Sequence, residues 1–351
     1  MNVKKHWWKI LGVAIVGYTL VAGLIVPLKP GIISVSHKSA NAGDSLRIEV
    51  IGYNTHFEGG KEDLKLWLKG DTTFFIQGQD VMIADENTLE VTFVIPALLP
   101  FDRSVVELSL LIYNGIDGPF ILPSAIFITH SPGSAGVQIG GWMKKIDLEI
   151  GSSRMAFPFR NILKETIRNT YFHVPLWFTM IFILIGSVFN ALKYLRTGAI
   201  IYDEKSSAYA TVGLLFGILG LLTGAVWAKN TWGAYWSFDI KQNMTAIALL
   251  IYFAYFVLRG SLEESTQKGK VSAVYNIFAF ATLIPLLYII PRLTDSLHPG
   301  AGGNPAFGGE DLDNTMRMVF YPAIIGWTLL AYWMGNLLHR AQTLKNKILF
   351  Q

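Results

Sequence analysis

Six long apolar stretches constrain the fold of this 351-residue chain more than any other feature of its sequence. Each holds roughly 20 residues, which as an α-helix are enough to cross the roughly 30 Å hydrocarbon core of a membrane. Only 15% of the residues are charged, whereas soluble domains carry about 25%, so one large soluble core does not account for the apolar residues. The sequence therefore predicts an all-α polytopic membrane protein whose six transmembrane helices lie at residues 8–26, 174–195, 209–227, 244–258, 274–290 and 319–338.

Basic residues are concentrated in alternate short loops between these stretches. Because lysine and arginine favour the cytoplasmic side of a membrane, this distribution predicts that both termini are cytoplasmic. The first stretch could instead be a cleaved signal peptide, but the Ala40–Ala42 triplet that resembles a cleavage site lies too far beyond it, so we expect a retained helix. The basic residues on the predicted cytoplasmic side are Lys4, Lys5, Lys9, Lys193, Arg196, Lys205, Arg259, Lys268, Lys270, Arg340, Lys345 and Lys347.

Four glycines follow one another in the third stretch at spacings of three or four residues. Small residues at such spacings let transmembrane helices approach closely. We interpret these positions as helix-packing sites without a specific functional meaning: Gly213, Gly217, Gly220 and Gly224.

The region between the first and second stretches, residues 31–150, has a different pattern. Apolar residues alternate with polar ones over 46–50, 89–95 and 106–112, and turn residues separate these runs. A period of two is typical of half-buried β-strands, so the sequence predicts an inserted, extracytoplasmic, immunoglobulin-like β-sandwich. Its histidines do not form a clustered ligand set, and a structural or docking role is the simplest interpretation: His37, His56 and His130.

Residues 151–172 form a third kind of segment. From Phe157 to Phe172, apolar residues recur at helical spacing with charged residues between them. This pattern predicts an amphipathic helix that lies on the membrane surface, or packs on the β-domain, and leads into the second transmembrane helix. The predicted organisation is a first transmembrane helix at 1–30, the β-sandwich at 31–150, the surface helix at 151–172 and a five-helix membrane domain at 173–351.

Two histidines lie at the predicted outer ends of transmembrane helices. His173 begins the second helix, His298 follows the fifth, and a tryptophan-rich loop at 232–239 lies on the same side of the membrane. Two neutral imidazoles can occupy both axial positions of a haem iron, and an aromatic loop offers a flat apolar surface for a porphyrin. Two histidines without a third ligand make a poor zinc site. The alternative is structural, because aromatic side chains gather at membrane interfaces without any ligand.

Charged residues near this loop could complete such a site. Lys229, Lys241 and Arg168 could pair with haem propionates, and Asp239 could orient a ligand through a hydrogen bond. The chain contains no cysteine, which excludes disulfides, thiol chemistry and thioether-linked haem. A haem bound here would therefore be held non-covalently, as haem b.

The stretch from Gly224 to Asp239 closely resembles the WWD signature of the cytochrome c assembly family. Within that family it is most similar to the haem exporter protein C (CcmC) branch, which writes the motif as W-G-x-W-W-x-W-D. The histidine contexts are similar too, with R-x-x-Y-x-H-V-P ending at Pro175 and L-H at Leu297-His298. The matching residues in and just before the loop are Thr223, Gly224, Trp227, Lys229, Thr231, Trp232, Gly233, Trp236 and Asp239.

The resemblance implies that His173 and His298 are axial ligands of haem and that the loop at 229–243 cradles it. It also implies that haem passes to a periplasmic haem chaperone, assisted by ABC transporter subunits, during cytochrome c maturation in the bacterial inner membrane. Together with the cations above, the predicted cofactor-binding residues are Arg168, His173, Trp227, Lys229, Trp232, Gly233, Tyr235, Trp236, Phe238, Asp239, Lys241 and His298.

The sequence departs from the family pattern at several positions. Tyr235 and Phe238 replace two expected tryptophans, so each keeps an aromatic face and loses an indole N–H. Lys241 stands where the family usually has arginine, which removes the bidentate geometry of a propionate contact. The large insertion between the first two helices is atypical of the branch and leaves the partner of the β-domain open.

Two other functions stay open at this point. A haem lyase that attaches haem to apocytochrome c would use the same motif, although such relatives tend to be larger and to carry histidines inside the membrane. A transporter permease without a fixed cofactor would need charges or broken helices within its spans, and the predicted spans are almost free of charge. We expect a haem-binding transfer factor rather than an enzyme, without catalytic residues.

Overall fold

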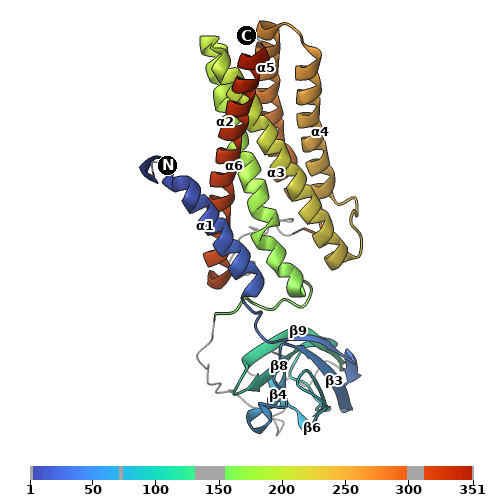
Figure 1. Ribbon diagram of the computed structural model, residues 1–351. Helices are drawn as coiled ribbons and strands as arrows, with labels where there is room; N and C mark the ends of the chain where they lie inside the picture. Colours follow the sequence, from blue (N-terminus) through green and yellow to red (C-terminus); the bar gives the residue numbers. More distant parts are fainter. Residues whose placement is uncertain (1–2, 71–73, 131–154, 299–311, 350–351) are drawn as a thin grey trace. The chain divides into compact units, whose positions relative to one another are not determined.

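The structure, a computed structural model, describes residues 3–70, 74–130, 155–298 and 312–349. Its contacts divide the chain into two compact units (Figure 1). One unit comprises Met1–Val26 and Glu165–Gln351 and holds the long helices, whereas the other comprises Pro27–Lys164 and holds the strands. Each unit has its own hydrophobic core. The β-rich unit is therefore an insertion between the first two long helices.

Among the described residues, six helices are long and apolar enough to cross a membrane, as predicted. Large apolar side chains such as Ile25, Leu222 and Val257 are exposed on them, and lipid tails suit such a surface. The chain is therefore a polytopic membrane protein. The helices are α1 (Val3–Ile25), α2 (His173–Thr197), α3 (Ile200–Trp232), α4 (Ile240–Ser261), α5 (Ser265–Ile284) and α6 (Asn314–Leu349).

Close packing of α3 against its neighbours forms the centre of the helical unit. A Cβ added at Gly213 would lie 2.6 Å from Leu184 Cδ2 on α2, and one added at Gly217 would lie 2.5 Å from Leu249 Cδ2 on α4. Helices in lipid associate mainly through such close van der Waals contacts. The packing role predicted for these two glycines is confirmed.

A buried ion pair joins the start of α3 to the end of α4. The Arg259 guanidinium donates to both carboxylate oxygens of Asp203, at 2.8 and 2.6 Å. The two side chains are only 15% and 6% exposed. Bidentate, charge-assisted pairs of this kind are strong and directional. The α3–α4 pair is thus held by this ion pair at one end and by the loop at 233–239 at the other.

Replacing Arg259 with alanine is expected to destabilise the helical unit by about 3–5 kcal/mol, because the Asp203 carboxylate would stay buried without a partner. Chemical unfolding of the purified protein in detergent, followed by circular dichroism, measures this loss. Arg259→Lys is the matched control: it keeps the charge, loses the fork geometry, and should destabilise less. Equal unfolding midpoints for wild type and Arg259→Ala would contradict the expectation.

The sixth helix extends further than predicted. Its apolar stretch ends at 338, but α6 continues to Leu349, so that His339 lies inside the helix and is 9% exposed. The His339 Nδ1 is 3.9 Å from the Glu204 carboxylate, and the Thr343 hydroxyl donates to Glu204 at 3.1 Å. Polar residues after an apolar stretch do not end a helix when they find partners on the neighbouring helix α3.

Two β-sheets enclose one hydrophobic core in the second unit. Residues alternate between core and surface along β3 and β8, with Ile48 and Leu110 fully buried, which confirms strands predicted from the period of two. Within the described residues the strand orders are β1-β3-β7-β6 and β2-β9-β8-β4-β5. The strands are β1 (Gly31–Val35), β2 (Ser39–Asn41), β3 (Ser45–Tyr53), β4 (Lys65–Lys69), β5 (Phe75–Gln77), β6 (Gln79–Ile83), β7 (Thr88–Val94), β8 (Val105–Asn114) and β9 (Gly118–Thr129).

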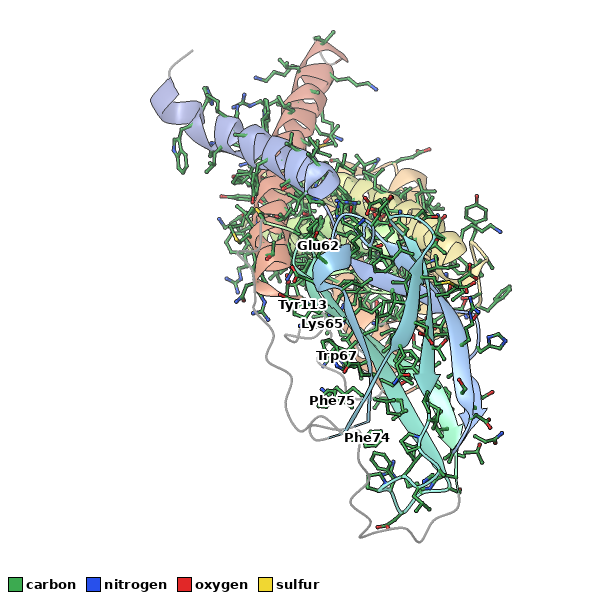
Figure 2. The ribbon with its side chains drawn as sticks, turned by 90° about the horizontal axis from the view of Figure 1, so that it is seen from below. Glu62, Lys65, Trp67, Phe74, Phe75 and Tyr113 are labelled. Atoms are coloured by element: carbon green, nitrogen blue, oxygen red, sulfur yellow. The ribbon has the colours of Figure 1, made fainter. Side chains whose placement is uncertain are left out.

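Strand β4 departs from this alternation. Leu66, Trp67 and Leu68 are all buried, and because Leu66 and Leu68 belong to the core, Trp67 faces the other side of the sheet. Figure 2 labels Trp67 together with Phe75 and Tyr113, which lie on the neighbouring strands β5 and β8. A strand buried on both faces has no period of two, so the sequence pattern did not reveal it.

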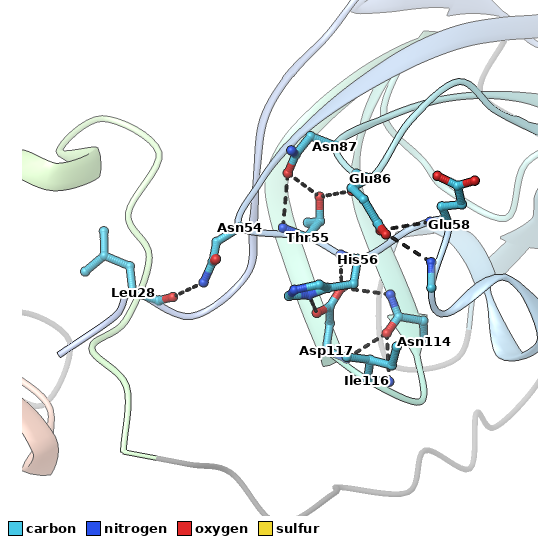
Figure 3. A network of polar contacts seen from close by, with 11 residues as sticks. Leu28, Asn54, Thr55, His56, Glu58, Glu86, Asn87, Asn114, Ile116 and Asp117 are labelled. Atoms are coloured by element: carbon cyan, nitrogen blue, oxygen red, sulfur yellow. Dashed lines mark hydrogen bonds and ion pairs between the residues drawn. The ribbon is translucent and has the colours of Figure 1, made fainter. Parts of the chain in front are cut away.

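A polar network ties loops of the β-rich unit together (Figure 3). The Asp117 side chain, 1% exposed, accepts hydrogen bonds from the His56 N–H, the His56 Nδ1 and the Asn114 Nδ2 at 2.7–2.8 Å. Glu86 accepts from the backbone N–H of Gly59 at 3.3 Å. His56 therefore holds two loops together, which agrees with the structural role we expected for it.

The segment predicted as an amphipathic helix, residues 151–172, is helical only over Lys164–Tyr171, as a 3-10 helix, and its first four residues lie outside the described part. Phe157 is fully buried and its backbone pairs with the stretch that follows α1. The Phe159 ring stacks on Tyr53 with centroids 5.0 Å apart. These contacts within the β-rich unit hold the segment extended and override its helical spacing.

Candidate functional site

His173 is the first residue of α2, and its ring packs on α3. The His173 Nδ1 lies 2.9 Å from the Gly220 carbonyl oxygen and 3.2 Å from the Thr223 hydroxyl. A backbone carbonyl can only accept, so Nδ1 donates and carries the proton. The lone pair of this half-buried imidazole is therefore on Nε2, which is the atom available to a metal.

Two glycines of α3 make room for this ring. A Cβ at Gly224 would lie 2.6 Å from His173 Cε1, which is closer than real side-chain atoms approach. A Cβ at Gly220 would lie 2.7 Å from Trp177 Cε2. The Trp177 ring in turn meets His173 edge-on, with centroids 6.2 Å apart. The last two glycines of the series therefore form a notch for a functional side chain, beyond the helix packing that we expected of them.

His298 lies in the loop after the 3-10 turn Ile290–Arg292 and not on a helix. Its Nδ1 donates to the Asp239 carboxylate at 2.8 Å, and its side chain is 17% exposed. Burial lowers the pKa of His298 below its ordinary value, and the Asp239 carboxylate offsets only part of that effect. The ring is therefore neutral at pH 7, with its lone pair on Nε2.

Asp239 is the hub that joins the tryptophan-rich loop to the His298 loop. It caps α4 by accepting from the Lys241 N–H at 2.9 Å, and it accepts from the Leu297 N–H at 2.8 Å and from the Ser296 hydroxyl at 2.9 and 3.0 Å. Burial raises the pKa of the Asp239 carboxyl, but these N–H groups and the neighbouring His298 outweigh burial, so the net pKa is lowered. A charged carboxylate that is 3% exposed thus orients the imidazole.

Two tryptophans pack against the same imidazole. The Trp232 and His298 ring centroids are 4.7 Å apart, and those of Trp227 and His298 are 5.9 Å apart. The two indoles meet each other edge-on at 4.8 Å. Both lie on α3, which continues five residues beyond the predicted end of the third span. This continuation places the two indoles beside His298.

The loop between α3 and α4 is closed by its own polar contacts. Gly233 ends α3 with a left-handed φ of 84°, a conformation that glycine adopts without strain. The Gln242 Oε1 accepts from the Ser237 N–H at 2.8 Å, and the Asn243 amide donates to the Phe238 carbonyl at 2.8 Å. Trp236 is half-buried, whereas the side chains of Tyr235 and Phe238 are 60% and 78% exposed.

The three cations predicted near the site have different surroundings. Lys229 donates to the Gly233 carbonyl at 2.8 Å. Lys241 donates its backbone N–H to the Asp239 carboxylate at 2.9 Å. Arg168 donates to the carbonyls of Gly23 and Val26 at the end of α1 and pairs with a neighbouring glutamate. Arg168 thus anchors α1, whereas Lys229 and Lys241 flank the tryptophan-rich loop.

The arrangement suits one kind of ligand. Each of the two imidazoles has its Nδ1 occupied, and neither Nε2 has a hydrogen-bond partner among the described residues. No cluster of three or more potential metal-binding side chains occurs in the part of the chain that the structure describes. Two open nitrogens beside aromatic rings therefore fit an iron porphyrin, which brings its own four equatorial ligands, better than a bare metal ion.

Several residues of this site were not predicted as functional. Ser296 and Gln242 gave no signal in the sequence, because their partners lie in loops whose pairing depends on the fold. Gly220 and Gly224 did give a signal, a spacing of small residues that is typical of helix packing, and Thr223 and Gly224 also match the family motif.

Comparisons with known proteins identify the family of this chain. The family model described as heme exporter protein C (CcmC) matches residues 152–349. Heme exporter protein C of Bradyrhizobium diazoefficiens is 24% identical over 189 residues, 52% of this chain and 69% of that protein. The Paracoccus denitrificans protein of the same name is 25% identical over 178 residues, 51% of this chain and 73% of that protein.

A shorter match links the chain to a second group. Cytochrome c biogenesis protein CcsA of Synechococcus sp. strain CC9902 is 37% identical over 79 residues, which are 22% of this chain and 26% of that protein. The family model spans more than half of the chain and includes both histidines, Asp239 and the tryptophan-rich loop. The chain therefore belongs to the heme exporter protein C (CcmC) family.

Proposed function

We propose that this protein binds haem non-covalently at the outer face of the bacterial inner membrane and delivers it to a haem chaperone for cytochrome c maturation. Haem is the cargo, held as haem b between two axial histidines and the tryptophan-rich loop. The chain has no cysteine for a thioether bond. The protein acts as a transfer and assembly factor, not as an enzyme.

The hydrogen bonding of the two imidazoles is the observation that supports this proposal most strongly. His173 and His298 come from segments more than a hundred residues apart, yet both direct Nδ1 to a fixed acceptor and keep Nε2 for a ligand. Metal-binding histidines in proteins have this arrangement, in which the second nitrogen is held by a carbonyl or a carboxylate. A histidine that only caps a helix would not need a carboxylate that is itself held by four other hydrogen bonds.

The proposed topology puts the site outside the cytoplasm. Six spans with both termini inside place the start of α2, the loop between α3 and α4, and the loop after α5 on the outer side, in line with the basic residues of the opposite loops. The β-rich unit, inserted between α1 and α2, would then be an extracytoplasmic β-sandwich. Lys229 and Lys241 would pair with the propionates, and Arg168 would hold α1 beside them.

The proposed partners follow from the names of the relatives. Proteins named heme exporter protein C and cytochrome c biogenesis protein CcsA match 189 and 79 residues of this chain, respectively. We infer that haem leaves this site for a periplasmic haem chaperone and that ABC transporter subunits of the same maturation system assist its release. Strands β1 to β9 of the β-rich unit lie outside the family match, and we infer that this unit contacts a further partner.

Purified wild-type protein is expected to carry haem with the absorption bands of a six-coordinate, low-spin iron. His173→Ala and His298→Ala should each shift these bands toward a five-coordinate form, and the double variant should lose most of the bound haem. His37→Ala is the matched control, because His37 is exposed and its Nδ1 contacts only the Ser36 hydroxyl at 3.0 Å. Identical spectra for wild type and the double variant would reject the axial assignment.

The similarity to CcsA proteins supports a second candidate, the attachment of haem to apocytochrome c. That activity would form thioether-linked cytochrome c in cells that have this protein but lack the haem chaperone. The transfer function predicts no such cytochrome under these conditions. Haem staining of denatured membrane proteins on gels separates the two candidates.

A further inference from the structure

We propose that the two axial histidines bind the haem iron with unequal strength. During haem transfer His173 dissociates from the iron first, and His298 dissociates last. This inference rests on the proposed function and adds an order to it. It follows from the hydrogen-bond acceptor of each Nδ1–H group. The acceptor is a carboxylate for His298 and a shared backbone carbonyl for His173.

The bond from His298 is charge-assisted. Its Nδ1 donates at 2.8 Å to the Asp239 carboxylate, which is 3% exposed and also accepts from the N–H groups of Lys241 and Leu297. Hydrogen bonds to ionised acceptors are roughly twice as strong as neutral ones. A carboxylate on the far nitrogen also raises the basicity of the ligating one, so His298 donates strongly to a metal.

The bond from His173 is neutral and shared. The Gly220 carbonyl that accepts from Nδ1 at 2.9 Å also accepts from the Thr223 hydroxyl at 3.0 Å. A carbonyl with a competing donor withdraws less charge from the N–H than a carboxylate does. His173 therefore has the lower basicity of the two and is the weaker donor to a metal.

The rings around the two imidazoles differ as well. His298 contacts the rings of Trp227 and Trp232 in addition to its carboxylate. His173 meets the ring of Trp177 edge-on, with centroids 6.2 Å apart. His298 is therefore held by a carboxylate and two indoles, and His173 by a shared carbonyl and one indole.

The consequence is a direction for haem transfer. When the bond to His173 breaks, a bond to the acceptor's ligand forms in its place, and no electron is transferred in this exchange. The acceptor therefore approaches from the start of α2. Haem remains tied to His298 until the new ligand is in place, so it is never released to the bulk.

Carbon monoxide tests this order in the full-length, haem-loaded, reduced protein, because it replaces the weaker axial ligand and reports on the one that stays. We expect it to replace His173, so that the Fe–CO stretching frequency measured by resonance Raman reports on His298. Asp239→Asn should then shift that frequency, and Ser296→Ala, which removes a competing donor to Asp239, should shift it the opposite way. Gly224→Ala, which crowds His173, should speed CO binding and leave the frequency unchanged.

The opposite pattern would overturn the inference. If Gly224→Ala shifts the Fe–CO frequency while Asp239→Asn and Ser296→Ala leave it unchanged, His298 is the ligand that leaves. If no variant shifts it, the two ligands are equivalent and the asymmetry is absent. A wild-type protein that shows no haem spectrum would instead be a failure of the proposed function, which the same samples reveal before CO is added. If Asp239→Asn folds poorly, Ser296→Ala alone tests whether the Fe–CO frequency depends on the hydrogen bonds of Asp239.

Discussion

Replacing Asp239 with alanine is expected to weaken haem binding by about 10- to 100-fold, the usual cost of removing a residue that orients a metal ligand. The carboxylate is the acceptor for four donor groups that together join α4, the tryptophan-rich loop and the His298 loop. Without it, the His298 ring loses its orientation and the two loops separate. Titration of the purified protein with haem, followed at the absorption maximum, measures the affinity.

The control for this variant is an acidic residue in the His298 loop, which Asp239 contacts. Asp295 is exposed and is next to Ser296 in the sequence. Asp295→Ala therefore removes a negative charge from the same region and leaves the hydrogen bonds of Asp239 in place. It should bind haem as the wild type does. If Asp239→Ala binds haem as tightly as Asp295→Ala, the loops are held by something other than this carboxylate, and the site geometry described above is wrong.

Gly224→Ala is expected to remove His173 from the haem while leaving α3 intact. The new Cβ would lie 2.6 Å from His173 Cε1 and 3.2 Å from its Nδ1, so the ring must move and lose its bond to the Gly220 carbonyl. The expected result is a shift of the absorption bands toward a five-coordinate iron, close to that of His173→Ala. Alanine in place of glycine otherwise favours a helix by about 1 kcal/mol, so unfolding of the helical unit should not become easier.

Gly260→Ala is the matched control for this substitution. Gly260 also lies in a long helix, α4, and a Cβ there meets nothing within 4 Å. Its spectrum should equal that of the wild type. A wild-type spectrum for Gly224→Ala as well would mean that the notch in α3 does not position His173.

The membrane part of the fold could be predicted from the sequence because its signals are local. Each span is one apolar stretch, and the length of a stretch depends only on the thickness of the membrane. The ends of the helices were harder to predict from the sequence, because they depend on contacts between segments. The loop was predicted to begin at residue 229, yet α3 continues to Trp232, and Gly233 then ends the helix with a left-handed φ.

In the β-rich unit, too, features with a local sequence pattern could be predicted, and features set by distant contacts could not. Strands β3, β7 and β8 have one buried face, so they appear as alternation, and the prediction for them is confirmed. Strand β4 is buried on both faces and gave no such pattern. The segment around Phe157 and Phe159 had helical spacing but is held extended by contacts with residues far away in the sequence.

For the candidate site, the identity of the key residues could be predicted from the sequence, but their orientation could not. The choice of His173 and His298 followed from topology and motif, since both flank predicted spans on one side. Their orientation did not, because Nδ1 of His173 depends on a backbone carbonyl of another helix. His298 was expected to follow the fifth helix, and it does lie in the loop after it, but its contact with Asp239 was not predicted. Contacts between side chain and backbone across helices leave no trace in residue spacing.

The central claim is that both imidazoles bind the same iron, and electron paramagnetic resonance of the haem-loaded, oxidised protein tests it most directly. With ¹⁵N-labelled histidine, pulsed measurements should show two directly bound imidazole nitrogens in a low-spin centre, and one in each of His173→Ala and His298→Ala. A high-spin iron in the wild type, or two bound nitrogens that persist in either variant, would contradict the account.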